Sequence, residues 1–160
     1  MVIAFLLLFS LSPSSWGDYS EKYCKSPYGF SDIDEPLRNI ITEGYSVEHV
    51  GVAKGMQFTV SKNLPTHRLL LLCDEYGKIV SISIYDTEED DSLYLTYLIS
   101  IPGNKGAGRA AIQELLKICI ERKLKQITVF AVIETKSFYR HLEFLDDENE
   151  LFLNRACQSF

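Results

Sequence analysis

The sequence is short of basic residues. Its 160 residues include 16 lysines and arginines against 22 aspartates and glutamates, which gives a formal net charge of -6. Proteins that bind nucleic acid generally carry a basic excess or a basic stripe. The basic cluster at Arg122, Lys123 and Lys125 follows a predicted helix, where positive charges interact favourably with the helix dipole. The composition therefore predicts no nucleic-acid partner.

Histidine and cysteine are scarce as well. The 3 histidines are scattered, and none lies at ligand spacing to another histidine or to a cysteine, so no metal site is predicted. The 4 cysteines show no paired spacing: Cys24, Cys73, Cys119 and Cys157. Because Cys73 and Cys119 fall within a predicted strand and a predicted helix face, we expect buried free thiols.

Apolar runs long enough to cross a membrane are absent, although residues 1–11 are strongly apolar. A serine- and proline-containing stretch follows them, as in a secretory signal, but the basic residues that usually precede such a run are missing. Residues 1–17 are therefore interpreted either as a targeting leader or as a first buried strand. No internal repeat interrupts residues 18–160, which we expect to form a single domain.

Glycine is infrequent too, yet three of the 9 glycines gather in residues 103–109, which read Gly-Asn-Lys-Gly-Ala-Gly-Arg. Glycines let a backbone approach a ligand without a clash from Cβ. The N–H groups at the start of a following helix would point into such a turn, where they favour an anion. The heptapeptide therefore predicts a site for a phosphate group, most simply a pyrophosphate.

The segments around the turn are strongly patterned. Residues 93–101 are apolar at nearly every position, which is typical of a strand covered on both faces, and Pro102 ends them. A helix is predicted after the turn, because its apolar residues recur at helical spacing: Ile112, Leu115, Leu116, Cys119, Ile120 and Leu124. Residues 127–133 follow as a second buried strand. The two strands should be parallel neighbours joined by the helix.

Upstream, the pattern predicts a helix over 31–43 and a short strand over 56–61. Residues 68–73 and 78–85 are expected to form a hairpin across the turn at 74–77. Residues 151–154 are expected to form a last strand.

Other nucleotide sites use a glycine turn in similar surroundings. A P-loop requires Gly-Lys followed by Ser or Thr at the helix start, and this segment lacks that tripeptide. Gly106, Gly108 and Ala111, with Glu134 at the end of the next predicted strand, satisfy a dinucleotide fingerprint. Such a domain repeats its unit after the turn, however, and only 27 residues follow position 133, which leaves this interpretation as an alternative.

The sequence resembles the Gcn5-related N-acetyltransferase (GNAT) family. The resemblance rests on residues 105–112, Lys-Gly-Ala-Gly-Arg-Ala-Ala-Ile, and residues 137–144, Ser-Phe-Tyr-Arg-His-Leu-Glu-Phe. It implies an α/β (α+β) fold with a mixed, mostly antiparallel sheet, a central parallel strand pair splayed at the acetyl-coenzyme A site, and helices on both faces. The order of the predicted elements agrees with this fold.

The same resemblance implies the site. Ile99, Ser100 and Ile101 would offer backbone groups to the pantetheine arm. The pyrophosphate would be held by the residues of the turn: Lys105, Gly106, Ala107, Gly108 and Arg109. Tyr139 would protonate the departing thiolate. The chain differs from the family pattern at Gly103, where Gln or Arg is preferred, and at Glu143, where Gly is usual.

The resemblance implies an N-acetyltransferase that moves an acetyl group from acetyl-coenzyme A to an amine of a small molecule or protein, in the cytoplasm and with a homodimer as one possibility. A secreted or membrane-targeted protein is the alternative if residues 1–17 are a leader. The two departures leave open a non-catalytic module of the same fold. No general base is identified, although Glu88, Glu89 and Glu134 are candidates. The acidic run 87–91 would attract cationic amines if it lay beside the acceptor.

Overall fold

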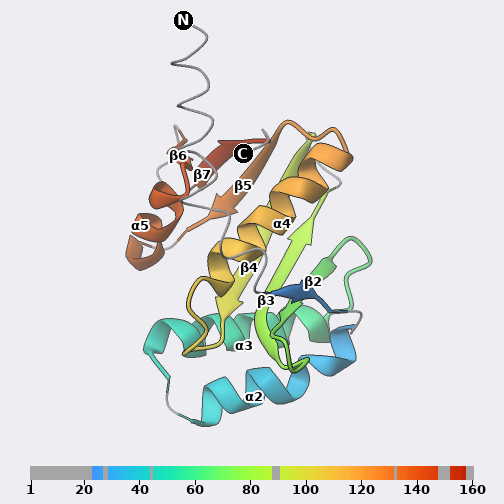
Figure 1. Cartoon of the computed structure of the whole chain (residues 1–160), viewed down its shortest axis with the longest axis vertical. Coiled ribbons are helices and arrows are strands. Elements are labelled where there is room, and N and C mark those ends of the chain that lie inside the picture. The colour runs from blue at the N-terminus through green and yellow to red at the C-terminus, as the bar shows by residue number, and fades with distance from the viewer. Residues whose placement is uncertain are drawn as a thin grey trace, which may run out of the picture.

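A seven-stranded sheet forms the centre of the computed structural model (Figure 1). The structure describes residues 23–26, 29–43, 45–87, 91–131, 133–147 and 152–157, so residues 1–17, Glu88 and Glu89 lie outside the described residues. The strands are β1 (Cys24–Lys25), β2 (Arg68–Cys73), β3 (Ile79–Asp86), β4 (Ser92–Ser100), β5 (Gln126–Phe130), β6 (Leu145–Asp146) and β7 (Phe152–Ala156). Their order in the sheet is β1-β2-β3-β4-β5-β7-β6.

Only β4 and β5 pair in parallel within this sheet, and every other neighbouring pair is antiparallel. The predicted parallel pair and the predicted hairpin are therefore confirmed. A doubly wound dinucleotide fold has a mostly parallel sheet, which this mixed sheet is not.

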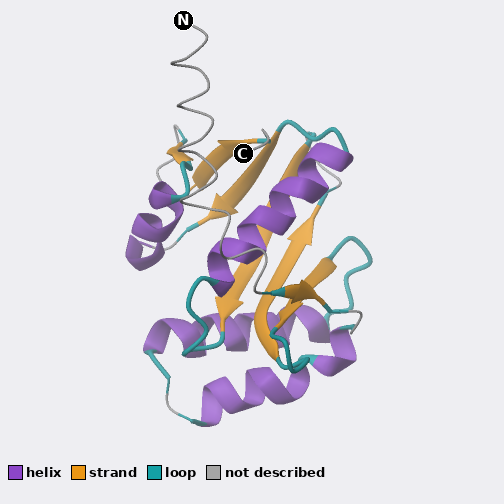
Figure 2. Cartoon of the chain, in the orientation of Figure 1, coloured by secondary structure: helices purple, strands orange, loops and turns teal. Residues whose placement is uncertain are grey.

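Helices cover both faces of the sheet (Figure 2). They are η1 (Phe30–Asp32), α2 (Asp34–Thr42), α3 (Val47–Ser61), α4 (Ala107–Glu121) and α5 (Ile133–His141). Apolar residues of α4 and α5 share one buried cluster with β4, β5 and β7, whereas those of α2 and α3 share another with β2, β3 and β4. The predicted helix over 31–43 corresponds to η1 and α2.

The predicted strand over 56–61 is wrong, because these residues end α3. A half-buried strand would bury Met56 and Phe58 together, but Met56 is fully buried and Phe58 is 63% exposed. Ala53 and Met56, three residues apart, form the buried stripe of a helix. The apolar residues of segment 56–61 alternate as they would in a strand, because α3 also carries apolar side chains on its exposed side.

Two smaller boundaries differ from the predictions. The strand expected over 127–133 ends at Phe130, and Ile133 begins α5, so Glu134 lies in the first turn of a helix rather than at a strand end. The last strand, expected over 151–154, is β7 at Phe152–Ala156.

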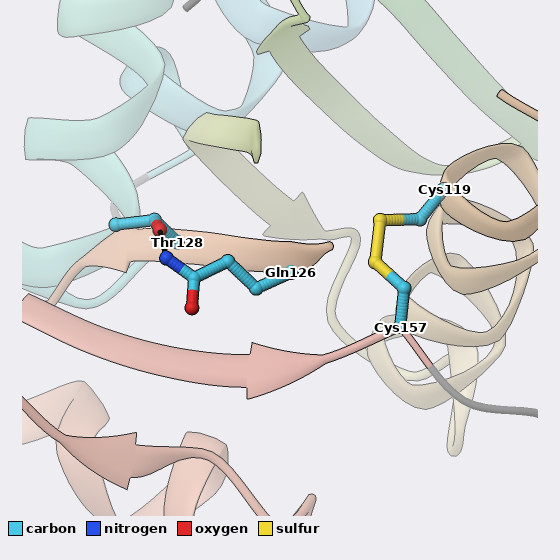
Figure 3. The surroundings of a disulfide bond; sticks show 4 residues. All are labelled: Cys119, Gln126, Thr128 and Cys157. Carbon is cyan, nitrogen blue, oxygen red and sulfur yellow. Dashed lines mark hydrogen bonds between the residues drawn. A yellow bond between two sulfur atoms is a disulfide. The ribbon is translucent and has the colours of Figure 1, made fainter. Parts of the chain in front are cut away.

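Cys119 and Cys157 form a disulfide, so the prediction of free thiols is wrong for this pair (Figure 3). Their Cα atoms are 5.9 Å apart although 38 positions separate them in the sequence. Cys119 lies near the end of α4, and Cys157 follows β7, which pairs with β5. Of the other two cysteines, both free, Cys73 is buried as expected and Cys24 is exposed.

Candidate functional site

β4 and β5 separate part-way along their length, next to a bulge in β4. Their parallel pairing ends where Leu95 faces Val129. On the other edge of β4, Leu95 faces Tyr85 while Tyr97 faces Ile84, which leaves Thr96 as an extra residue. The bulge changes the faces of β4, because Leu95 packs in the α4 cluster and Tyr97 packs in the α2–α3 cluster.

A wide cavity of about 740 Å³ lies along the separated strands. Its walls are Val47, Glu48, Gly51 and Val52 of α3, residues 94–98 of β4, residues 128–130 of β5, Glu134, Thr135 and Tyr139 of α5, and Phe152 of β7. This volume is within the range of sites for small organic ligands. Thr128 is fixed in the wall, since its Oγ1 donates to Asn154 Oδ1 (2.7 Å) and accepts from Gln126 Nε2 (3.4 Å). Figure 3 shows Gln126 and Thr128.

A narrow cavity of about 250 Å³ adjoins the wide one. Leu98, Ile99 and Ser100 form its β4 wall, while α3 contributes Glu48, His49 and Val52 and α5 contributes Thr135, Phe138 and Tyr139. Both cavities share Glu48, Val52, Leu98, Thr135 and Tyr139. A ligand in one cavity would therefore meet a ligand in the other beside these shared residues.

Tyr139 lies where the two cavities meet. Its side chain is only 6% exposed and makes edge-on ring contacts with Phe138 and Phe144, at centroid distances of 5.1 and 5.4 Å. Burial raises the pKa of the Tyr139 phenol above its usual value near 10. The phenol therefore keeps its proton at neutral pH, as a general acid requires.

The glycine turn joins the end of β4 to the start of α4 (Figure 1). Gly106 is the N-cap of α4 with φ of +83°, a left-handed conformation that favours glycine. Asn104 Nδ2 donates to the Ile101 carbonyl (2.9 Å), and the Tyr23 hydroxyl donates to the Lys105 carbonyl (2.8 Å). These bonds hold the turn in place at the N-terminus of a 15-residue helix.

Gly108 brings α4 close to the narrow cavity. A Cβ at this position would lie 3.0 Å from Ser100 Oγ and 3.2 Å from Phe138 Cζ, both on residues that line that cavity. Such distances are too short for unstrained packing. The glycine is thus required for close approach, and not for an unusual backbone angle.

The remaining site residues predicted from the sequence have different surroundings. Ser100 lines the narrow cavity, whereas the Ile99 side chain is 3% exposed within the α2–α3 cluster. The Ile101 N–H donates to the Val80 carbonyl (2.9 Å) and so points toward β3. Since amides alternate along a strand, Ser100 turns its backbone toward the open edge of β4. Lys105 is exposed, Arg109 is half-buried and Ala107 is fully buried.

Sequence reasoning missed Glu48 and His49, which α3 places at the narrow cavity. Ser46 caps this helix, because its hydroxyl accepts from the His49 N–H (3.3 Å) and also lies 2.6 Å from His49 Nδ1. Hydrogen bonds from its own N–H and from Ser46 lower the pKa of the Glu48 carboxyl, and an electrostatic interaction with His49 acts in the same direction. Ser46 was the available signal, since serine is a preferred helix cap.

Similar folds are found among solved structures. A GNAT-family acetyltransferase from Staphylococcus aureus Mu50 matches with a TM-score of 0.61 and 13% identity over 85% of this chain and 99% of that one. Tetrahymena Gcn5 matches with a TM-score of 0.62 and 8% identity over 87% of this chain and 96% of that one. The PaiA N-acetyltransferase of Thermoplasma acidophilum, in complex with coenzyme A, matches with a TM-score of 0.57 and 13% identity over 82% of this chain and 96% of that one. The chain has the GNAT fold. No protein-family model and no curated protein matches its sequence.

Both departures from the GNAT pattern occur at residues with positive φ. Gly103 has φ of +90°, so a side chain there would be strained even though the surrounding space is open. Glu143 adopts φ of +66°, at a cost of about 1 kcal/mol for a residue other than glycine. Its carboxylate is paired with buried Arg155 (3.3 Å), which also donates to the Leu142 carbonyl. The turn after α5 therefore forms without glycine.

Neither Thr87 nor Asp91, the two ends of the acidic run, lines either cavity of this GNAT fold. Arg122 donates to Thr87 Oγ1 (3.0 Å), and Lys125 pairs with Asp91 (3.3 Å), at the C-terminal end of α4. The glycine turn lies at the other end of α4, about 22 Å away. Among the described residues, no helix is long and apolar enough to span a bilayer, and no cluster of His, Cys, Asp and Glu could hold a metal ion.

Proposed function

We propose that the protein is an acetyl-coenzyme A-dependent N-acyltransferase that acts on an amine of a small molecule or protein. The observation that carries this proposal is the meeting of the two cavities at Tyr139, where β4 and β5 separate. A two-substrate transfer needs two adjoining sites, and a proton donor between them speeds departure of the leaving group.

The residues around the turn and the narrow cavity fit coenzyme A. Lys105 and N–H groups of the first turn of α4 would hold the pyrophosphate, because the helix N-terminus favours an anion. The Ala107 N–H would not take part, since it donates to the Asn104 carbonyl (3.2 Å). The pantetheine arm would follow Ser100 along the narrow cavity, past the surface that Gly108 keeps free of a side chain. When bound, acetyl-coenzyme A supplies the thioester whose acetyl group is transferred. Two structural neighbours were solved with coenzyme A or acetyl-coenzyme A, which supports this assignment.

The proposed transfer balances in bonds and in protons. The acceptor ammonium first loses a proton to give a neutral amine. That amine attacks the thioester carbonyl carbon, so that a carbon–nitrogen bond forms and the carbon–sulfur bond breaks. Tyr139 donates its phenol proton to the thiolate, and the proton lost from the acylated nitrogen restores the phenol. One proton is released to solvent in each turnover.

Acetyl-coenzyme A should raise the thermal midpoint of the protein, since a ligand that binds only the native state stabilises it. At 100 times its Kd the expected gain is about 2.7 kcal/mol, which corresponds to roughly 5–10 °C for a chain of this size. Differential scanning fluorimetry measures this shift in the thermal midpoint, and NAD at the same concentration is the control. A shift with NAD alone would overturn the proposal. A shift with acetyl-coenzyme A, but no thiol release with any amine of a panel, would indicate a non-catalytic module.

Gly108→Val should abolish the acetyl-coenzyme A shift while leaving a folded protein. The new side chain would displace Phe138 and Ser100 into the narrow cavity, where they would block the path of the pantetheine arm. Overpacking of this kind costs about 1–3 kcal/mol of folding stability, which a folded domain tolerates. Gly29→Val is the matched control, because Gly29 has extended backbone and a Cβ there meets nothing within 4 Å. Unchanged affinity in Gly108→Val would place the pantetheine arm elsewhere.

A further inference from the structure

We propose that the acceptor is a primary amine carried on a compact aromatic body, with the body in the wide cavity and the nitrogen beside Glu48. The inference rests on the proposed function, and it names the substrate class of the same site. It follows from the walls of the wide cavity and from the charges that line them.

The wide cavity presents aromatic surface that no side chain of the described residues covers fully. Phe130 is 52% exposed, and its ring meets that of Phe152 edge-on at 5.5 Å. Val47 of α3, another residue of the cavity wall, is 85% exposed. Exposed apolar groups gathered in a concave site favour a ligand that buries them. An aromatic ring meets this requirement with little loss of conformational entropy.

The charged side chains that line the wide cavity are carboxylates. Glu48 and Glu134 are its two charged lining residues, and no lysine, arginine or histidine lines it in the part of the chain that the structure describes. Two carboxylates create a negative potential that attracts an ammonium ion and repels an anion. Exposed aromatic faces add a cation–π attraction for the same charge.

Glu48 decides where the nitrogen lies. It lines both cavities, as does Tyr139, whereas Phe130 and Phe152 line only the wide cavity. An amine held by Glu48 therefore lies at the end of the wide cavity that faces the thioester, with its body directed toward the two phenylalanines. A long polar acceptor, such as a peptide or a polyamine, would leave polar groups against these apolar walls.

The test compares 2-phenylethylamine with n-propylamine, 1,4-diaminobutane and a lysine-containing peptide as acceptors. We expect kcat/KM to be at least about tenfold higher for 2-phenylethylamine than for n-propylamine, because an added ring buries apolar surface in the cavity. Equilibrium binding of each amine to the protein saturated with coenzyme A gives a second readout that needs no turnover. Higher kcat/KM for the diamine or for the peptide would overturn the inference while leaving the proposed function intact.

Two variants test separately the binding of the aromatic body and the binding of the amine nitrogen. Phe130→Ala should raise KM for 2-phenylethylamine by about tenfold and leave n-propylamine nearly unchanged. Glu48→Gln should raise KM for both amines by about fivefold, because it removes the charge and keeps the shape. The control is Phe58→Ala, since Phe58 is an exposed phenylalanine of α3 that does not line the cavity.

The failures of the two proposals are distinguishable. Binding of 2-phenylethylamine that is lost in Phe130→Ala, without transfer to any amine, would support an aromatic-amine site in the wide cavity and overturn the N-acyltransferase proposal. Equal effects of Phe130→Ala on both monoamines would overturn the aromatic acceptor.

Discussion

Cys157→Ser is expected to lower the thermal midpoint of the protein by roughly 10 °C. The disulfide that it removes closes a loop with a sequence separation of 38, and loop-closure entropy makes such a crosslink worth about 4 kcal/mol. Cys157 is the better position to change, because Cys119 is fully buried and a serine there would add a buried hydroxyl. Thermal unfolding with and without a thiol reductant measures the effect.

The control for this experiment is Cys24→Ser, which removes an exposed free thiol. A reductant should lower the wild-type midpoint to that of Cys157→Ser and should leave that variant unchanged. Acetyl-coenzyme A affinity should survive, since the disulfide holds the end of α4 opposite to the glycine turn. Equal midpoints for wild type and Cys157→Ser under oxidising conditions would contradict the contribution assigned to the disulfide.

The disulfide also illustrates what the sequence could not predict. Cys119 and Cys157 meet only because β7 pairs with β5, which is the strand that follows α4. The pairing of β7 with β5 depends on the whole sheet and cannot be predicted from the spacing of the cysteines. The positions of Cys73 and Cys119 in apolar segments predicted burial correctly for both, but burial does not distinguish a thiol from a disulfide.

Elements with strong local periodicity were predictable. The apolar strand β4, the glycine turn and the amphipathic helix α4 each carry their signal within about 15 residues, and β5 follows directly as the parallel neighbour. Gly103 and Gly106 both adopt positive φ, as a turn built on glycine requires. The resemblance to the GNAT family rested on this part of the chain, and the fold is confirmed.

The walls of the wide cavity were not predictable, because their residues come together only through tertiary structure. α3 was partly assigned as a strand, so Glu48 and His49 had no predicted place near Tyr139. The bulge at Thr96 has no marker in the sequence, although it moves Tyr97 to the opposite face of β4. Phe130 and Phe152 lie 22 positions apart and are brought together by the pairing of β5 with β7.

Tyr139→Phe is expected to slow acetyl transfer by about 100-fold, the lower end of what loss of one general acid costs, because a thiolate is a good leaving group. The variant should fold and bind acetyl-coenzyme A like the wild type. It keeps the ring that packs between Phe138 and Phe144 and removes only the hydroxyl.

Single-turnover transfer to the best amine, measured between about pH 6.5 and about pH 9.5, isolates the chemical step. Burial raises the pKa of Tyr139 above its usual value near 10, so the wild-type phenol stays protonated across this range and the ratio of wild-type to variant rates should stay constant. Tyr76→Phe, at a tyrosine that is 87% exposed and lines neither cavity, should keep the wild-type rate. A Tyr139→Phe rate equal to the wild-type rate would make Tyr139 a packing residue, and the thiolate would then take its proton from water.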